Sequence, residues 1–273
     1  MDELKKYQEI GKAFVEKLKL STYPVAVRLI KPNENVPESA FSPFDAFNSE
    51  VPACLTYTWC RRAGLSFYLT KDDIACKPIV IYFGLDELSN PEDLYKAWTR
   101  KAMYKRDMAA EKSSRESDAR FELGEFKGFV ISPLNETISI PHLMMIYCSP
   151  LILSHLILAA TFNGGNITSN FNGMEASCKE GIIRTYKTNQ CQVVSPGMGD
   201  RVMAGVQDHE MIFSIPECEF ETVLENLFKA GTKIPVTPFG IPHIVPTLGL
   251  KKLFGLPVEP DVWPTLRRKL KRK

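Results

Sequence analysis

The chain has 273 residues, 44% of them hydrophobic and 24% charged, with a formal net charge of +2. This length is enough to bury a sizeable core, and the composition is that of an ordinary globular protein. A charge so close to neutral does not favour nucleic acid as a partner, and none is expected.

The start of the chain bears on its location. Residues 1–6 are largely charged and lead into a helical pattern, without the apolar stretch of a secretory signal. Seven cysteines without such a signal indicate a reducing compartment, so we expect a cytoplasmic protein. In that setting the cysteines are interpreted as metal ligands, catalytic thiols or buried hydrophobes, and not as disulfides.

The first part of the chain predicts two helices and two strands. Apolar residues recur every three or four positions over residues 3–19, which is typical of an amphipathic helix. Residues 25–30 alternate like a strand, and residues 31–50 form a loop. A helix-like run over residues 53–63 ends at a glycine, and a short strand over residues 65–69 follows it.

The second part predicts further elements of both kinds. A polar helix is expected over residues 90–112, short buried strands over 129–131 and 211–215, and an amphipathic helix over 217–229 with Gly231 as its C-cap. Residues 143–162 approach the length of a membrane span. Because Ser149 and Pro150 interrupt this stretch, we interpret it as a buried strand, 143–148, followed by an apolar core helix, and expect no membrane span.

The amino-acid composition of the chain changes near residue 231. Seven prolines between residues 235 and 264 forbid long regular elements. We therefore predict one globular domain over residues 1–230 and a proline-rich C-terminal arm with a basic tail over residues 231–273. The apolar residues of the arm suggest packing on the domain or on a second subunit, which makes a homo-oligomer possible.

The order of elements suggests an internal repeat. Residues 24–85 and residues 141–186 both show a strand, a helix, a glycine, a second strand, a loop, and then a Cys-Lys pair that enters a helix. The glycine lies 12 residues before the cysteine in the first half and 13 in the second. We predict an α/β or α+β fold in which two related β-α-β-type halves form one domain.

The repeat predicts that two of the cysteines occupy equivalent positions in the two halves. Two halves related by a pseudo-twofold axis would bring Cys76 and Cys178 together at helix N-termini, which stabilise thiolates. We predict an iron–sulfur cluster, of the [4Fe–4S] type, held by Cys54, Cys76 and Cys178. The fourth ligand is Cys60, Cys148, Cys191 or His155, or the position stays open for a small molecule.

Two alternatives remain open. One is a cysteine-dependent enzyme without metal, in which Cys76 or Cys178 pairs with His155 or His209. The other is a small-ligand-binding module whose cysteines are buried and inert. No catalytic residue is assigned, and the motif Gly197–Arg201 is interpreted as a turn followed by a structural Asp–Arg pair and not as a phosphate loop.

Several of these residues carry a resemblance. Cys54, Cys76, Cys178, the Gly199–Arg201 segment and the Phe213–Pro216 segment together resemble the pattern of domain-of-unknown-function family 169. The likeness spans residues 10–230 and leaves the C-terminal arm outside. The resemblance implies that the three cysteines match cysteine positions of a family widespread in archaea and anaerobic bacteria. Such hosts would suit an iron–sulfur protein with a redox role and a redox partner protein.

Overall fold

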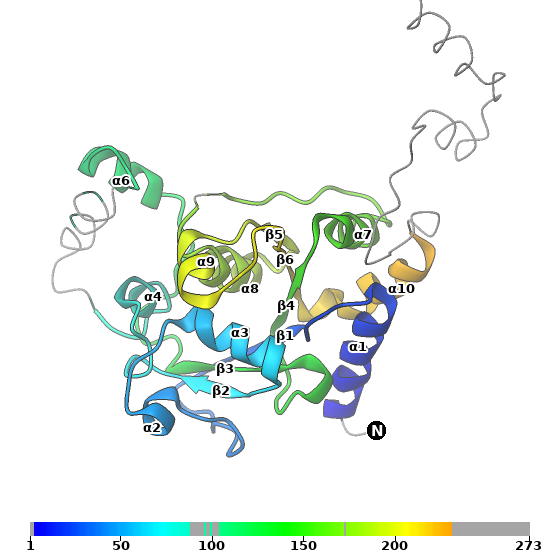
Figure 1. The fold of residues 1–273 in the computed structure, drawn as a ribbon, viewed down its shortest axis with the longest axis horizontal. Coiled ribbons are helices and arrows are strands. Elements are labelled where there is room, and N and C mark those ends of the chain that lie inside the picture. The colour runs from blue at the N-terminus through cyan, green and yellow to red at the C-terminus, as the bar shows by residue number, and fades with distance from the viewer. Residues whose placement is uncertain (1–2, 88–95, 97–98, 100–103, 172, 231–273) are drawn as a thin grey trace, which may run out of the picture. The chain divides into compact units, whose positions relative to one another are not determined.

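A computed structural model describes residues 3–87, 96, 99, 104–171 and 173–230 of the chain. Its centre is a six-stranded antiparallel sheet with the order β2-β3-β1-β4-β6-β5 (Figure 1). The strands are β1 (Val25–Ile30), β2 (Phe67–Leu69), β3 (Gly128–Pro133), β4 (Leu143–Cys148), β5 (Gln192–Val194) and β6 (Met211–Pro216). The fold is therefore α+β.

The strand order is symmetric about the central pair. β1 and β4 run antiparallel, with Val25 opposite Met145, and each is followed outward by the third strand and then the second strand of its own half. The duplication predicted from the sequence is therefore visible in the topology. The two halves align differently from our prediction. Residues 167–171 form no strand, and β5 is the second strand of the second half.

One face of the sheet is covered by three helices. These helices are α1 (Glu3–Leu18), α7 (Pro150–Ala160) and α10 (Phe220–Lys229). Phe14, Leu156 and Val223 lie almost fully buried against Met144 and Phe213 of the sheet. Short 3₁₀ turns, η1 (Leu134–Glu136) and η3 (Glu217–Glu219), follow β3 and β6.

The other face of the sheet carries a second group of helices. They are α3 (Ala53–Ala63), α4 (Lys77–Tyr82), the π-helix η2 (Ser177–Arg184) with its continuation α8 (Thr185–Thr188), and α9 (Met198–Ala204). Their core contacts are with the β1 and β4 side chains that point to this face, among them Val27 and Met145. Two peripheral helices, α2 (Pro43–Phe47) and α6 (Met108–Arg115), complete the described elements.

The apolar stretch over residues 143–162 divides as predicted into β4 and α7. Ser149 caps α7 by accepting a hydrogen bond from the Ile152 N–H, and Pro150 occupies the first turn. Among the described helices, none combines the length and the hydropathy needed to cross a bilayer. The predicted arm and basic tail, Gly231, and most of the predicted helix over 90–112 fall outside the described residues; α6 overlaps the end of that helix.

A backbone contact close to α4 gives a testable consequence. Gly84 has a φ of +65°, and a Cβ added to it would lie 2.1 Å from the Glu122 carbonyl oxygen. We expect Gly84→Ala to lower the free energy of unfolding by about 3 kcal/mol, because left-handed strain and overpacking add. Urea denaturation measures the change.

A second glycine serves as the matched control. Gly124 has a φ of +73°, but a Cβ there would meet nothing within 4 Å. Gly124→Ala should therefore show the backbone strain alone, about 1 kcal/mol. Equal losses for the two variants would contradict the importance of the close approach at Gly84.

Candidate functional site

A cavity of about 380 Å³ opens where α3, α4, η2 and α9 begin. Each of the four helices α3, α4, η2 and α9 contributes residues from its start, and the segments before α4, α6 and η2 contribute the rest. The lining is predominantly apolar and rich in sulfur. Its residues are Ala53, Cys54, Ala75, Cys76, Lys77, Pro78, Ile79, Tyr104, Met174, Glu175, Ser177, Cys178, Met198, Gly199, Asp200 and Met203.

Cys54 lies in the first turn of α3. The helix begins after Pro52 and ends at Gly64, whose left-handed conformation (φ of 72°) suits a helix C-terminus. The Cys54 side chain is largely buried, and its thiol donates a weak hydrogen bond to the Gly199 carbonyl at 3.7 Å. This contact joins the start of α3 to the start of α9.

Cys76 is the N-cap residue of α4, and Pro78 lies in the first turn as predicted. The side chain is half-buried. The backbone N–H of Ala53, the first residue of α3, faces the Cys76 sulfur and favours its thiolate form. The second cysteine of the cavity is thereby held against the helix that carries the first.

Cys178 is the second residue of η2, as Cys54 is the second residue of α3. Its sulfur lies 3.2 Å from the Tyr57 hydroxyl, so η2 and α3 are joined inside the protein. π-helical turns are rare and frequently mark functional sites. In the strand topology Cys178 corresponds to Cys54, and not to Cys76 as the sequence repeat suggested; the position that matches Cys76 is Gly197, the N-cap of α9.

The structure does not bring the other predicted ligands to this cavity. Cys60 lies on α3 and is fully buried in the core, and Cys148 faces the opposite side of the sheet. His155 lies on α7, on that opposite side as well, and Cys191 lines a separate polar pocket of about 270 Å³. His209 is an exposed turn residue before β6. None of these five residues lines the cavity.

Asp200 is a cavity residue that sequence reasoning undervalued. It is 3% exposed, and it accepts hydrogen bonds from the Ser177 hydroxyl and from the Gly197 N–H. Arg201 instead donates to the Gln207 carbonyl, so the structural Asp–Arg pair predicted from the motif does not form. Burial raises the pKa of Asp200, although both hydrogen bonds oppose that shift. The Gly-Met-Gly-Asp motif was the available signal.

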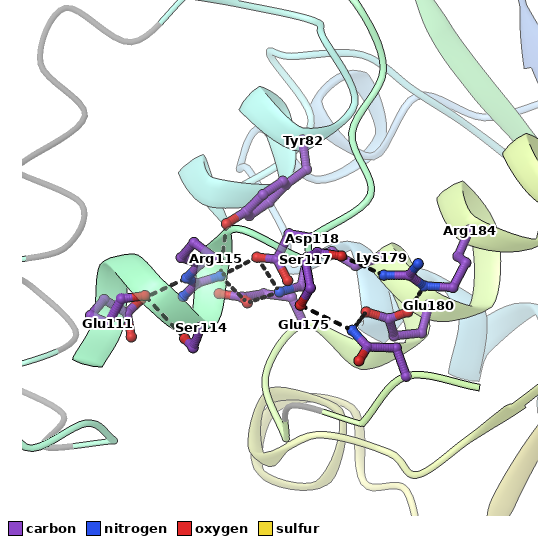
Figure 2. A network of polar contacts seen from close by, with 11 residues as sticks. Tyr82, Glu111, Ser114, Arg115, Ser117, Asp118, Glu175, Lys179, Glu180 and Arg184 are labelled. Carbon is purple, nitrogen blue, oxygen red and sulfur yellow. Dashed lines mark hydrogen bonds and ion pairs between the residues drawn. The ribbon is translucent and has the colours of Figure 1, made fainter. Parts of the chain in front are cut away.

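A buried network of charges borders the cavity through Glu175 (Figure 2). The Glu175 carboxylate accepts a hydrogen bond from Arg115 at 2.9 Å and lies 3.5 Å from the Lys179 ammonium group. Arg115 also pairs with Glu111 and with Asp118, and the Lys179 ammonium lies 2.7 Å from Asp118. The network ties α6 to η2. Glu175 itself adopts a left-handed φ of 44°, a strained conformation for a residue with a side chain.

The electrostatics of the three thiols are uniform. Burial is the largest cause that raises the pKa of Cys54, of Cys76 and of Cys178, and the buried Asp200 carboxylate acts in the same direction on each. At neutral pH the thiols of the metal-free protein are therefore protonated. A protonated thiol is a weak nucleophile, which argues against catalysis by a free thiolate here.

This protonation predicts slow alkylation. In the metal-free protein at pH 7 to 8, iodoacetamide should modify Cys54, Cys76 and Cys178 far more slowly than the exposed Cys218. Their rates should rise about tenfold per pH unit and keep rising above pH 9, because the thiolate fraction grows with pH below a raised pKa. Peptide mass spectrometry measures each rate. A plateau below pH 8 would instead support a reactive catalytic thiol.

A mononuclear metal site is not evident from the geometry. Within the part of the chain that the structure describes, no three His, Cys, Asp or Glu side chains lie close enough to hold a single metal ion. The three cysteines surround a shared space instead.

Comparison with known proteins adds the family. The model of the family DUF169, described as "Uncharacterised ArCR", matches residues 13–226, which is most of the chain. The chain belongs to this family. The matched range begins inside α1 and ends inside α10, so it includes the whole sheet and every wall of the cavity.

One relative gives the same result. An uncharacterized protein of Methanocaldococcus jannaschii, MJ0308, is 24% identical to the chain over 228 residues, which cover 82% of this chain and 95% of the relative. The search of solved structures found no significant match. Membership of the DUF169 family thus carries no activity with it.

Proposed function

We propose that the cavity binds an iron–sulfur cluster, with Cys54, Cys76 and Cys178 as its protein ligands. The observation that carries the proposal is the position of the three cysteines. Cys178 lies more than a hundred residues after Cys54 and Cys76 in the chain, yet all three line one cavity. Cysteines that were only buried hydrophobes would have no reason to share one space, and Cys60 and Cys148 show such burial elsewhere.

The surroundings suit thiolate ligands. Cys54 and Cys178 occupy the first turns of α3 and η2, where free N–H groups and the helix dipole favour negative charge. A metal deprotonates a coordinating thiol outright, so the raised thiol pKa values do not prevent binding. They do imply that binding releases protons, and that affinity rises with pH.

The cavity leaves room beside the cysteines. None of the four predicted fourth ligands lines it, and the space is bordered by Met174, Met198 and Met203. We propose that the fourth cluster position is open toward this space, where a small molecule would bind. A cluster held by three cysteines supplies a Lewis-acidic iron and a one-electron couple. The side chains of the cavity wall would exclude water and select a bound molecule by its shape.

The wider setting follows from the same cysteines. All seven are free in the structure, which supports a reducing compartment such as the cytoplasm. A cluster with a redox role would also need a redox partner protein.

A second function has one observation in its favour. A volume of about 380 Å³ with a mostly apolar lining lies within the range of small-molecule binding sites. In that case the cysteines would be inert wall residues, and the protein would bind its ligand without a metal.

Anaerobic purification distinguishes the two functions. The cluster predicts a brown protein with a broad sulfur-to-iron absorption band and about four iron and four acid-labile sulfide atoms per chain, the content of a [4Fe–4S] cluster. Reconstitution with ferrous iron and sulfide should give the same content. A colourless protein that stays free of iron after reconstitution would refute the cluster and leave the second function.

A further inference from the structure

The hydroxyl of Tyr57 contacts the sulfur of Cys178, one of the three cavity cysteines. Tyr57 lies one turn after Cys54 on α3, so both side chains point to the same side of the helix. Its ring is fully buried, and its hydroxyl lies 3.2 Å from the Cys178 sulfur. A phenol from α3 and a thiol from η2 thus meet inside the protein.

The chemistry of the pair decides the direction of the hydrogen bond. When both groups are neutral, either one can donate. A metal-bound thiolate has no proton, so only the Tyr57 hydroxyl can then donate. A hydrogen bond from a neutral donor to an anionic acceptor is stronger than one between two neutral groups, and a dry environment strengthens it further.

We infer that Tyr57 is a positioning residue that donates a hydrogen bond to the thiolate of Cys178 and thereby raises the reduction potential of the cluster. The inference rests on the proposed function. Reduction places additional negative charge on the iron and its sulfur ligands, so a donated hydrogen bond stabilises the reduced form more than the oxidised form. Hydrogen bonds to sulfur are among the factors that set cluster potentials.

Tyr147 provides a matched control in the same part of the core. It lies on β4, is 4% exposed, and its electrostatic neighbours include Cys54, Cys178 and Asp200. Its hydroxyl, however, has no hydrogen-bond partner among the described residues. Tyr147→Phe removes a buried phenol of the same kind from the same surroundings without removing a bond to Cys178.

The test is a redox titration of the cluster-loaded full chain, followed by visible absorption, for the wild type, Tyr57→Phe and Tyr147→Phe. Tyr57→Phe should keep the wild-type iron content and lower the potential. The expected shift corresponds to about a tenfold change in the reduction equilibrium, or about 59 mV for a one-electron couple. Tyr147→Phe should shift the potential by much less.

A second measurement needs no variant. In heavy water, an exchangeable O–H donor should shift the iron–cysteine stretching frequencies of the wild-type protein in resonance Raman spectra, and Tyr57→Phe should reduce that shift. Full iron loading with an unchanged potential in Tyr57→Phe, or equal shifts in both tyrosine variants, would overturn the inference while the cluster stands. Absence of iron from the wild type would overturn both.

Discussion

Cys54→Ala is expected to abolish iron binding, and Cys76→Ala and Cys178→Ala are expected to do the same. Each removes one of the three thiols that line the cavity, and two cysteines are too few to retain a cubane cluster. Iron and sulfide per chain, measured after anaerobic reconstitution, should fall to background in all three variants. The metal-free forms should lose only about 1 to 2 kcal/mol of unfolding free energy, because each side chain is small.

Cys60→Ala is the matched control for this series. Cys60 lies on the same helix as Cys54 and is fully buried, but it faces the core and not the cavity. It should cost a similar amount of stability and retain the full iron content. Iron retained by Cys54→Ala, or lost equally from Cys60→Ala, would contradict the ligand assignment.

Arg61→Met should have the largest effect on stability. Arg61 is fully buried at the end of α3, and its guanidinium group donates two hydrogen bonds, of 2.6 and 2.9 Å, to the carboxylate of Glu210. It also lies 4.3 Å from the centre of the Tyr147 ring. Its removal leaves the Glu210 charge buried without its partner. We expect the free energy of unfolding to fall by about 3 to 5 kcal/mol in chemical denaturation.

The neighbouring arginine tests whether charge alone is responsible. Arg62 lies 3.9 Å from the same carboxylate but is 42% exposed, so Arg62→Met should change stability by less than about 1 kcal/mol. The double variant Arg61→Met with Glu210→Gln should recover part of the loss, because it no longer buries an unpaired charge. A small effect of Arg61→Met alone would show that water reaches Glu210.

The same pair predicts a dependence on pH. Burial opposes the ionisation of Glu210, but the Arg61 hydrogen bonds and the Gln207 N–H outweigh it, and the pKa of Glu210 is lowered. Its contribution to stability is therefore complete above the pKa of an unfolded glutamate and is lost as the pH falls through the folded value. The difference in unfolding free energy between the wild type and Glu210→Gln should shrink as the pH is lowered through that range.

Strong local patterns predicted much of the fold. The strands Val25–Ile30 and Leu143–Cys148 and the helix Ala53–Ala63 have the expected bounds, because apolar runs bounded by proline and glycine leave few alternatives. The sequence does not predict β5, which has only three residues, and it predicts a strand over residues 167–171, which are irregular in the structure. Neither carries enough periodicity to reveal itself.

The site was predictable only in part. Cysteine is chemically distinctive, so Cys54, Cys76 and Cys178 stood out, and the structure brings them to one cavity. Tyr57 did not stand out, since a tyrosine in an apolar helix looks like any core residue. Arginine and lysine are ordinarily surface residues, but Arg115 and Lys179 are buried. Arg115 pairs with Glu175 and Lys179 pairs with Asp118, and no local pattern shows these pairings between distant segments.

The distribution of the cavity walls over the two halves of the sheet governs when the site can form. Cys54 and Cys76 are synthesised early, but Cys178, Asp200 and the strand β6 that supports them follow more than a hundred residues later. A ribosome that has produced only the first half has made a chain with an incomplete pocket. A group held by all three sulfurs therefore gains its last protein ligand only after residue 178 has been synthesised and η2 has formed against α3.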